Sequence, residues 1–506
     1  MSERKKGVVL SYIQVIISII VNIVYVPILL KFLGKGEYGL HQLVGSFFSY
    51  INIFEACMSN AVLRNYCDAL AHKDRVKANS TLYIAKKIYQ VLGVVLMIVG
   101  IGILLSFRSF YYSSLTSSEI KEGTYMLVVL FVNMFISLNG SVYTTMVVGN
   151  ERFVFFKGTM IVTQVIQPFL VFFLVRKQPY AIMVTLGFTV VNVLCVLCRY
   201  IYSRKLIGPI KKCRDVDKTI VKQILSLSSA VLLGTIADQI FWKADQVILG
   251  KLFNTAVIAV YSVGAQIYMI YMQFGMQIAN VFYPRLSALY AEENGLKRVS
   301  DLFIKVGRLT LYILLLILTG FILFGKEFLQ LWVGQGYEEA YYIAIIVMIP
   351  FSIDLAQNLG LVILQIVGQY NFRAKIYFVS AFLNIFTTII LAARYGIIGA
   401  AVSTGLSMLI TNVIIMNIYY KRKTGLDINE YWKQVIMILL MSVLLMLMAL
   451  FVKSISGLLF SNVIVLSGGI LVYICVYVLL MYFFVMNNYE RELIRSVIST
   501  KFAKCP

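Results

Sequence analysis

Long apolar runs alternate with short polar and basic connections along almost the whole chain. A membrane-spanning helix needs about 20 consecutive, mostly apolar residues. Fourteen runs meet this length, so we predict fourteen spanning helices, and counts of twelve and thirteen stay open as alternatives. The predicted helices cover residues 8–33, 38–63, 79–106, 123–147, 153–175, 180–203, 228–250, 256–284, 302–325, 340–367, 372–393, 397–420, 431–453 and 459–486.

The composition indicates that these runs belong in a membrane and not in a soluble core. Of the 506 residues, 60% are hydrophobic and only 13% are charged, whereas about a quarter of a typical soluble chain is charged. A soluble protein of this length cannot bury so much apolar surface, so lipid must solvate much of it. We therefore predict an all-α, polytopic membrane protein.

The basic residues indicate how the chain is oriented. A net charge of +22 would suggest a nucleic-acid partner in a soluble protein. Here the charges cluster between apolar runs, and about three quarters of the Lys and Arg residues fall on one side of the membrane if the N-terminus is inside. This bias predicts cytoplasmic N- and C-termini and contact with membrane lipids, and no nucleic-acid partner. The first apolar run is too long for a cleavable signal peptide and is expected to be a retained helix.

The chain also contains an internal repeat. Residues 148–153 (VGNERF) match 367–372 (VGQYNF), and residues 202–205 (YSRK) match 420–423 (YKRK) at nearly the same offset. An even number of helices in each copy gives both copies the same orientation, so the repeats are parallel. We predict a six-helix lobe at 1–205, a basic connection at 206–227, a second six-helix lobe at 228–423, and two additional helices with a cytoplasmic tail at 424–506.

The seventh predicted helix carries a continuous polar face. Polar residues inside spanning helices are costly and tend to face a water-filled cavity or a partner. At 100° per residue, the polar side chains fall within one arc and the rest of the helix is apolar. The face can be the wall of a substrate cavity or an interhelical contact that fixes packing. The residues are Thr235, Asp238, Gln239, Trp242, Lys243, Asp245 and Gln246.

Three further helices carry candidate polar residues. On the first helix, Gln14, Asn22 and Tyr25 share one face with Ser11 and Ser18, which predicts a second cavity wall. On the second helix, Glu55 is the one acid at depth. After Pro350 on the tenth helix, Asp354 and Gln357 are candidates for ion coupling, although an isolated carboxyl can also be hydrogen-bonded and protonated. Arg64 and Arg285 are expected near the cytoplasmic mouth, where contact with lipid headgroups is the simpler explanation for Arg64.

The sequence lacks the motifs of nucleotide-binding and metal-binding sites. The Gly-Lys pairs at 34–35, 250–251 and 325–326 lack the glycine spacing and the Ser or Thr of a nucleotide-binding loop. The sequence has two His residues, and its seven Cys residues are scattered, so no metal site is expected. The Cys195-x-x-Cys198 pair lies in an apolar helix and is interpreted as packed thiols. We predict neither a cofactor nor a nucleotide partner, and no enzymatic activity.

Short motifs give the chain a family resemblance. Residues 32–39 (FLGKGEYG) follow the first helix, and residues 396–401 (GIIGAA) open the twelfth. Residues 244–250 (ADQVILG) end the seventh helix, and 260–262 (VYS) come after it. With two six-helix halves and two further helices, the chain resembles the polysaccharide-transporter branch of the multidrug/oligosaccharidyl-lipid/polysaccharide exporter superfamily. The resemblance implies flipping of a polyprenyl-diphosphate-linked oligosaccharide across the bacterial plasma membrane by alternating access. It also implies a central cavity lined by the first, second, seventh and eighth helices, with Lys243 meeting the diphosphate or an acidic sugar.

Two alternatives stay open. A cation-coupled multidrug exporter of the same superfamily would use the acids Glu55, Asp238 and Asp354. A membrane-embedded glycan polymerase or ligase is a more remote alternative, because such enzymes usually carry a large external loop and no external connection here exceeds about twenty residues. The leading hypothesis is the flippase, with a lipid-linked glycan as substrate and a coupling cation or the membrane potential as the energy source.

Overall fold

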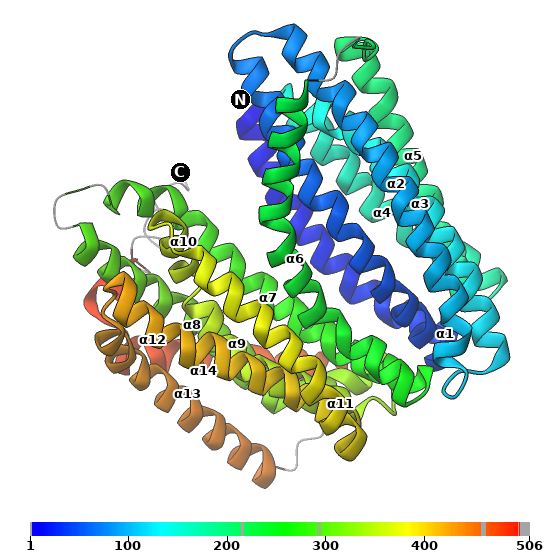
Figure 1. Cartoon of the computed structure of the whole chain (residues 1–506). Coiled ribbons are helices and arrows are strands. Elements are labelled where there is room, and N and C mark those ends of the chain that lie inside the picture. The colour runs from blue at the N-terminus through cyan, green and yellow to red at the C-terminus, as the bar shows by residue number, and fades with distance from the viewer. Residues whose placement is uncertain are drawn as a thin grey trace, which may run out of the picture. The chain divides into compact units, whose positions relative to one another are not determined.

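The computed structural model is all-helical over the residues it describes, which are 3–213, 217–290, 292, 295–456, 462–493 and 495. This confirms the predicted fold class (Figure 1). The helices are α1 Glu3–Ala71, α2 Arg75–Tyr111, α3 Ser117–Gly149, α4 Phe153–Lys177, α5 Ala181–Ile207, α6 Lys218–Leu252, α7 Thr255–Tyr290, α8 Gly295–Val333, α9 Glu338–Ala356, α10 Leu359–Ile366, α11 Tyr370–Met408, α12 Met416–Tyr419, α13 Ile428–Ser456 and α14 Val463–Phe484, with π-helical segments at Leu409–Ile415 and Tyr420–Thr424.

Twelve helices of the described chain are long and apolar enough to cross a membrane. Two of them each contain a glycine with non-helical dihedral angles, Gly34 in α1 (φ 72°, ψ 178°) and Gly396 in α11 (φ 63°, ψ −149°). An L side chain rarely adopts a positive φ, so only glycine joins the two arms there without strain. Each arm is long enough for a crossing, which requires about 20 residues, because the arm after Gly396 continues through the π-helical segments and α12 to Thr424. Counting the arms separately gives the fourteen crossings of the prediction.

One predicted helix is interrupted in the structure. The run predicted as a single helix over 340–367 forms α9 and α10, which meet at Gln357 and Asn358. Pro350 lies inside α9, so the break does not occur at the proline. The amide of Gln357 donates to the carbonyls of both Ile353 and Asp354 at 3.1 Å, which tightens the last turn of α9 and ends it.

The chain divides into two compact units, Met1–Ser262 and Val263–Pro506, and the division falls inside α7. In the first unit, α1 packs against α6, α4 and α3, and α3 packs against α5 and α2. In the second unit, α8 packs against α9, α13 and α14, and α9 against α11. The predicted lobe boundaries at 205 and 228 describe the sequence repeat and stay a prediction.

The motif at residues 32–39 fixes helix ends in the first unit. An added Cβ on Gly39 would lie 1.7 Å from the carbonyl oxygen of Thr255, so only glycine allows this close approach. Carboxylate oxygens of Glu37 and Glu122 accept the amides of Ala181 and Ile182 at 2.8 and 3.0 Å. These bonds satisfy two amides that have no partner within the helix, so the two acids stabilise the start of α5.

An aromatic pair recurs in both units and supports the internal repeat. Phe155 stacks on Tyr202 with ring centroids 3.7 Å apart, and Phe372 stacks on Tyr419 at 3.9 Å. The two pairs have the same separation along the chain, and both join the start of one spanning segment to the end of the next. The pairing aligns Tyr202 with Tyr419, one residue from the match suggested by the sequence letters.

Candidate substrate-binding site

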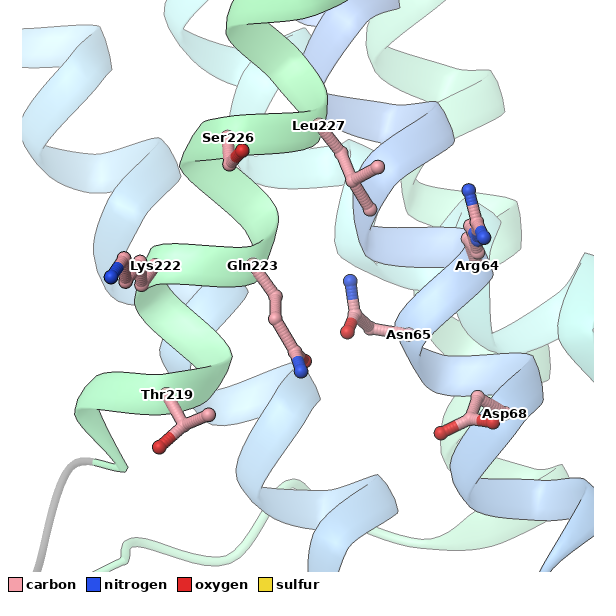
Figure 2. A pocket seen from close by; sticks show the side chains of 8 residues that line it. All are labelled: Arg64, Asn65, Asp68, Thr219, Lys222, Gln223, Ser226 and Leu227. Atoms are coloured by element: carbon pink, nitrogen blue, oxygen red, sulfur yellow. The ribbon is translucent and has the colours of Figure 1, made fainter.

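A polar pocket lies between the end of α1 and the start of α6 in the first unit (Figure 2). Its volume is about 500 Å³. Figure 2 shows Asn65 and Gln223 reaching from α1 and α6 into the space between the two helices. We define this as the α1–α6 pocket, and its lining consists of Arg64, Asn65, Asp68, Thr219, Lys222, Gln223, Ser226 and Leu227.

The α1–α6 pocket carries more positive than negative charge. Arg64 and Lys222 are both exposed, and Asp68 is the one acid of the lining. The Nζ atom of Lys77, outside the lining, lies 3.0 Å from a carboxylate oxygen of Asp68. Because this lysine offsets the charge of Asp68, the lining keeps a net positive charge, with Arg64 on α1 and Lys222 on the side of α6 that faces away from α1 in Figure 2.

The start of α6 sets the positions of the lining residues. Asp217 is the N-cap, and its carboxylate accepts the amide of Thr219 at 2.8 Å. The backbone amide and hydroxyl of Thr219 lower the pKa of Asp217, so the cap is ionised at neutral pH. Thr219, Gln223 and Ser226 then recur at helical spacing and share one face toward α1. Lys222 also lines an adjoining cavity of about 530 Å³ with Lys218 and Ser229.

The predicted polar face of the first helix contacts the first unit through Gln14. Nζ of Lys157 on α4 donates to Oε1 of Gln14 at 3.0 Å. The side-chain amide of Asn22 donates to the carbonyl of Ser18 at 2.8 Å. The hydroxyl of Tyr25 is buried without a hydrogen-bond partner among the described residues. Apolar side chains such as Ile16 and Ile20 form the exposed face of this helix instead.

The predicted polar face of the seventh helix, now in α6, separates into two parts. Asp245 and Gln246 are buried, where the Tyr261 hydroxyl donates to Asp245 and the Gln246 amide donates to Ser262 at 3.2 Å. Asp238 is exposed, while Gln239, Trp242 and Lys243 are half-buried. Lys243 forms no ion pair within the described part of the chain. Asp245 and Gln246 thus make packing contacts with the start of α7, and their role in a substrate cavity stays a prediction.

The remaining predicted residues lie in separate places. Glu55 is half-buried and accepts the hydroxyl of Ser141 on α3 at 2.5 Å. In the second unit, the carboxyl of Asp354 faces Asn412 and the guanidinium of Arg373. Buried Gln357 exchanges hydrogen bonds of 3.0 and 2.9 Å with Asn417.

Arg285 is exposed on α7 in the second unit. Arg64 is thus the one residue of the predicted set that lines the α1–α6 pocket. The sequence pattern indicates Lys222 only as one charge of the basic connection, and it does not single out Asn65 or Gln223. The recurrence of Thr219, Lys222, Gln223 and Ser226 at helical spacing was the signal that could have revealed this face.

The sequence model of a family described as polysaccharide biosynthesis protein matches residues 4–290. A probable low-salt glycan biosynthesis flippase of Haloferax volcanii is 21% identical over 196 residues, 38% of this chain and 41% of that protein. A capsular polysaccharide biosynthesis protein of Staphylococcus aureus is 26% identical over 208 residues, 40% of this chain and 50% of that protein. The chain spans half or less of the length of these curated relatives.

Two solved structures share the fold over most of the chain. A lipid II flippase MurJ in an inward closed conformation matches with a TM-score of 0.71 at 14% identity, covering 96% of this chain and 99% of that one. An inward-facing multidrug resistance MATE family transporter matches with a TM-score of 0.63 at 13% identity, covering 84% of this chain and 99% of that one. At this identity the likeness establishes the fold.

Proposed function

Because the chain belongs to the polysaccharide biosynthesis protein family, we propose that it is a flippase for lipid-linked oligosaccharides of the polyprenyl-diphosphate type. It moves its substrate across the bacterial plasma membrane for surface polysaccharide biosynthesis, by alternating access and without enzymatic chemistry. The N- and C-termini are cytoplasmic in this proposal. The excess of Lys and Arg on one side of the predicted topology supports that orientation.

The α1–α6 pocket is the observation that carries the proposal. A diphosphate is a compact anion, and a guanidinium and an ammonium group bind it by charge-assisted hydrogen bonds. Arg64 and Lys222 supply these two groups at the ends of spanning helices, and the charge of Asp68 is offset by Lys77. Gln223, Thr219 and Ser226 add neutral donors and acceptors suited to sugar hydroxyls. The pocket thus combines the two chemistries of a glycan diphosphate.

Lys243 is the third cation that we assign to the substrate path, after Arg64 and Lys222. In the sequence, Lys243 shares one predicted polar face with two acids, Asp238 and Asp245, so this face has a net negative charge. Since Tyr261 binds the buried carboxylate of Asp245, that acid is already engaged in packing. The half-buried ammonium group of Lys243 can then meet a phosphate at membrane depth, where an electrostatic contact is stronger than in water.

A cation-coupled multidrug exporter is the second candidate. The observation that favours it is the pair of acids held inside the helix bundles, Glu55 against Ser141 and Asp354 against Asn412. Such a protein would bind organic cations, for which acids and not bases are the natural partners. Asp354 and Gln357 remain our candidates for ion coupling in either case. Gln357 would act there by holding Asn417.

Reconstituted vesicles can separate the two candidates. Purified protein is incorporated into vesicles that carry a fluorescent polyprenyl-diphosphate oligosaccharide, and a membrane-impermeant quencher reports the fraction exposed outside. We expect the protein to raise the rate of exposure over empty vesicles, and Lys243→Ala to abolish most of the gain. Efflux of an organic dye cation with no movement of the glycolipid would contradict the flippase and support the exporter.

A further inference from the structure

A second cavity of the first unit lies outside the proposed substrate site. Its volume is about 760 Å³, and it is enclosed by the end of α1, the start of α2, the end of α3 and the connection that follows α5. Its lining contains three bases, Arg75, Lys211 and Lys212, and no acid. We call it the connection pocket, and no residue of the α1–α6 pocket lines it.

The connection is built to lie over this pocket. Gly208 ends α5 with φ 88°, a conformation that favours glycine, and Pro209 cannot continue the helix. The chain then returns to α2, where the side-chain amide of Asn79 bonds both backbone groups of Lys211, each at 2.9 Å. The hydroxyl of Ser80 lies 3.4 Å from Sγ of Cys213. These contacts hold the two lysines of the connection at the rim.

The chemistry of the lining is divided between rim and floor. Arg75, Lys211 and Lys212 are exposed, and none of the three forms an ion pair within the described ranges. The lining also contains apolar side chains, of which Leu82 and Met146 are buried and form the floor, whereas Val76 and Ile207 are exposed. A cationic rim over an apolar floor fits a molecule with an anionic head and a hydrocarbon chain.

The neutral polar groups of the pocket are already engaged. Asn79 is bound to Lys211, and Asn150 donates to the Tyr66 hydroxyl at 3.0 Å and to the Met146 carbonyl at 2.8 Å. A glycan needs many unused donors and acceptors, whereas a small phosphate headgroup needs mainly cations. This distinguishes the connection pocket from the α1–α6 pocket, where Gln223 and Thr219 face the cavity.

The position of the pocket suits a lipid of the membrane surface. Its helical lining residues all lie near the ends of four helices, Tyr66 to Leu70 on α1, Arg75 to Leu82 on α2, Met146 on α3 and Ile207 on α5. Spanning helices end in the headgroup region, where anionic phospholipids meet basic side chains.

We propose that the connection pocket binds an anionic membrane phospholipid, with the phosphate on Lys211, Lys212 and Arg75 and part of an acyl chain on the apolar floor. The bound lipid joins the connection to α1, α2 and α3, in addition to the clamp made by Asn79. The proposal concerns a resident lipid and does not depend on which substrate the protein moves.

Native mass spectrometry of the detergent-solubilised full chain, titrated with phosphatidylglycerol, tests this directly. We expect the Lys211→Gln/Lys212→Gln variant to bind about thirtyfold more weakly than the wild type, since each basic residue near an anionic membrane surface strengthens binding by about fivefold. Asn79→Ala, which releases the connection, should weaken binding as well. The control Arg204→Gln/Lys205→Gln removes two exposed charges next to the pocket without touching its lining and should bind as the wild type does.

Three competitors decide the source of the anion. Phosphatidylcholine should not displace phosphatidylglycerol, and equal competition would show that only the acyl chain is recognised and overturn the proposal. Displacement by inorganic phosphate at similar concentrations would make this a site for soluble anions. Tighter binding of a polyprenyl monophosphate would make it a substrate site. If the control variant Arg204→Gln/Lys205→Gln bound phosphatidylglycerol as weakly as Lys211→Gln/Lys212→Gln, the loss would reflect overall basic charge and would also contradict the proposal.

Discussion

Two arginines of this protein occupy opposite environments. Arg308 on α8 is 5% exposed, and its guanidinium binds the 2%-exposed carboxylate of Glu490 at 2.6 Å, the carbonyl of Gln434 and the hydroxyl of Tyr312. Arg64 is exposed at the α1–α6 pocket and has no ion-pair partner among the residues described. The two residues have the same chemistry, but only Arg64 retains the capacity to bind something else.

The comparison separates structural from functional charge in a membrane protein. Desolvating a charge costs several kcal/mol unless partners replace its water. Arg308 meets this requirement with acceptors from three segments of the chain. Its hydrogen-bonding groups are therefore occupied by partners inside the protein, above all Glu490. Arg64 and Lys222 keep their hydration and can exchange it for a phosphate. We therefore expect variants at the two sites to affect different measurements.

The largest effect on stability is expected for Glu490→Gln. Removing one charge of a buried pair leaves the other uncompensated, which costs about 3–5 kcal/mol. The free energy of unfolding in detergent micelles, from denaturant titration, measures the loss. Glu430→Gln is the control, because Glu430 pairs with the 81%-exposed Lys433 at 3.9 Å and such surface pairs contribute about 0–1 kcal/mol. Equal losses in the two variants would contradict the assignment of Arg308 to structure.

A smaller loss of stability is expected for Tyr261→Phe. The change removes the donor from the buried carboxylate of Asp245. A hydrogen bond to a charged group contributes about 1.5–3 kcal/mol. Tyr112→Phe at a 75%-exposed position controls for the loss of a hydroxyl in the same unfolding measurement. An unchanged free energy of unfolding for Tyr261→Phe would contradict a packing role for Asp245 and would make it a candidate substrate contact.

The sequence allowed the helices to be predicted well, because the length of an apolar run is a local property. The arms of α1 and α11 were found for this reason, and Gly34 and Gly396 permit the sharp joints between them. The break at Gln357 was missed, since an apolar run continues through it. Polar faces were also recognised on the first and seventh helices.

The partners of those polar residues could not be predicted in the same way. Glu490 lies 182 residues from Arg308, and Lys157 lies 143 residues from Gln14. A periodic pattern identifies the face of a helix and does not identify the helix that packs against it. The sequence predicts Arg64 near a cytoplasmic mouth, but no local pattern separates Lys222 from the other basic residues of the connection that precedes it. The difference between a satisfied and an available polar group became visible only with the fold.

The most direct test of the account is the double variant Arg64→Gln/Lys222→Gln, measured for both flipping and stability. We predict a loss of about tenfold or more in the rate of glycolipid exposure in vesicles, since two charge-assisted contacts to the diphosphate are removed. The free energy of unfolding should change by less than about 0.5 kcal/mol, as for exposed positions in general. Arg204→Gln/Lys205→Gln, with the same loss of charge outside the α1–α6 pocket, should flip at the wild-type rate. Flipping by the Arg64→Gln/Lys222→Gln variant at the wild-type rate, with the protein folded, would contradict the assignment of the α1–α6 pocket to the substrate.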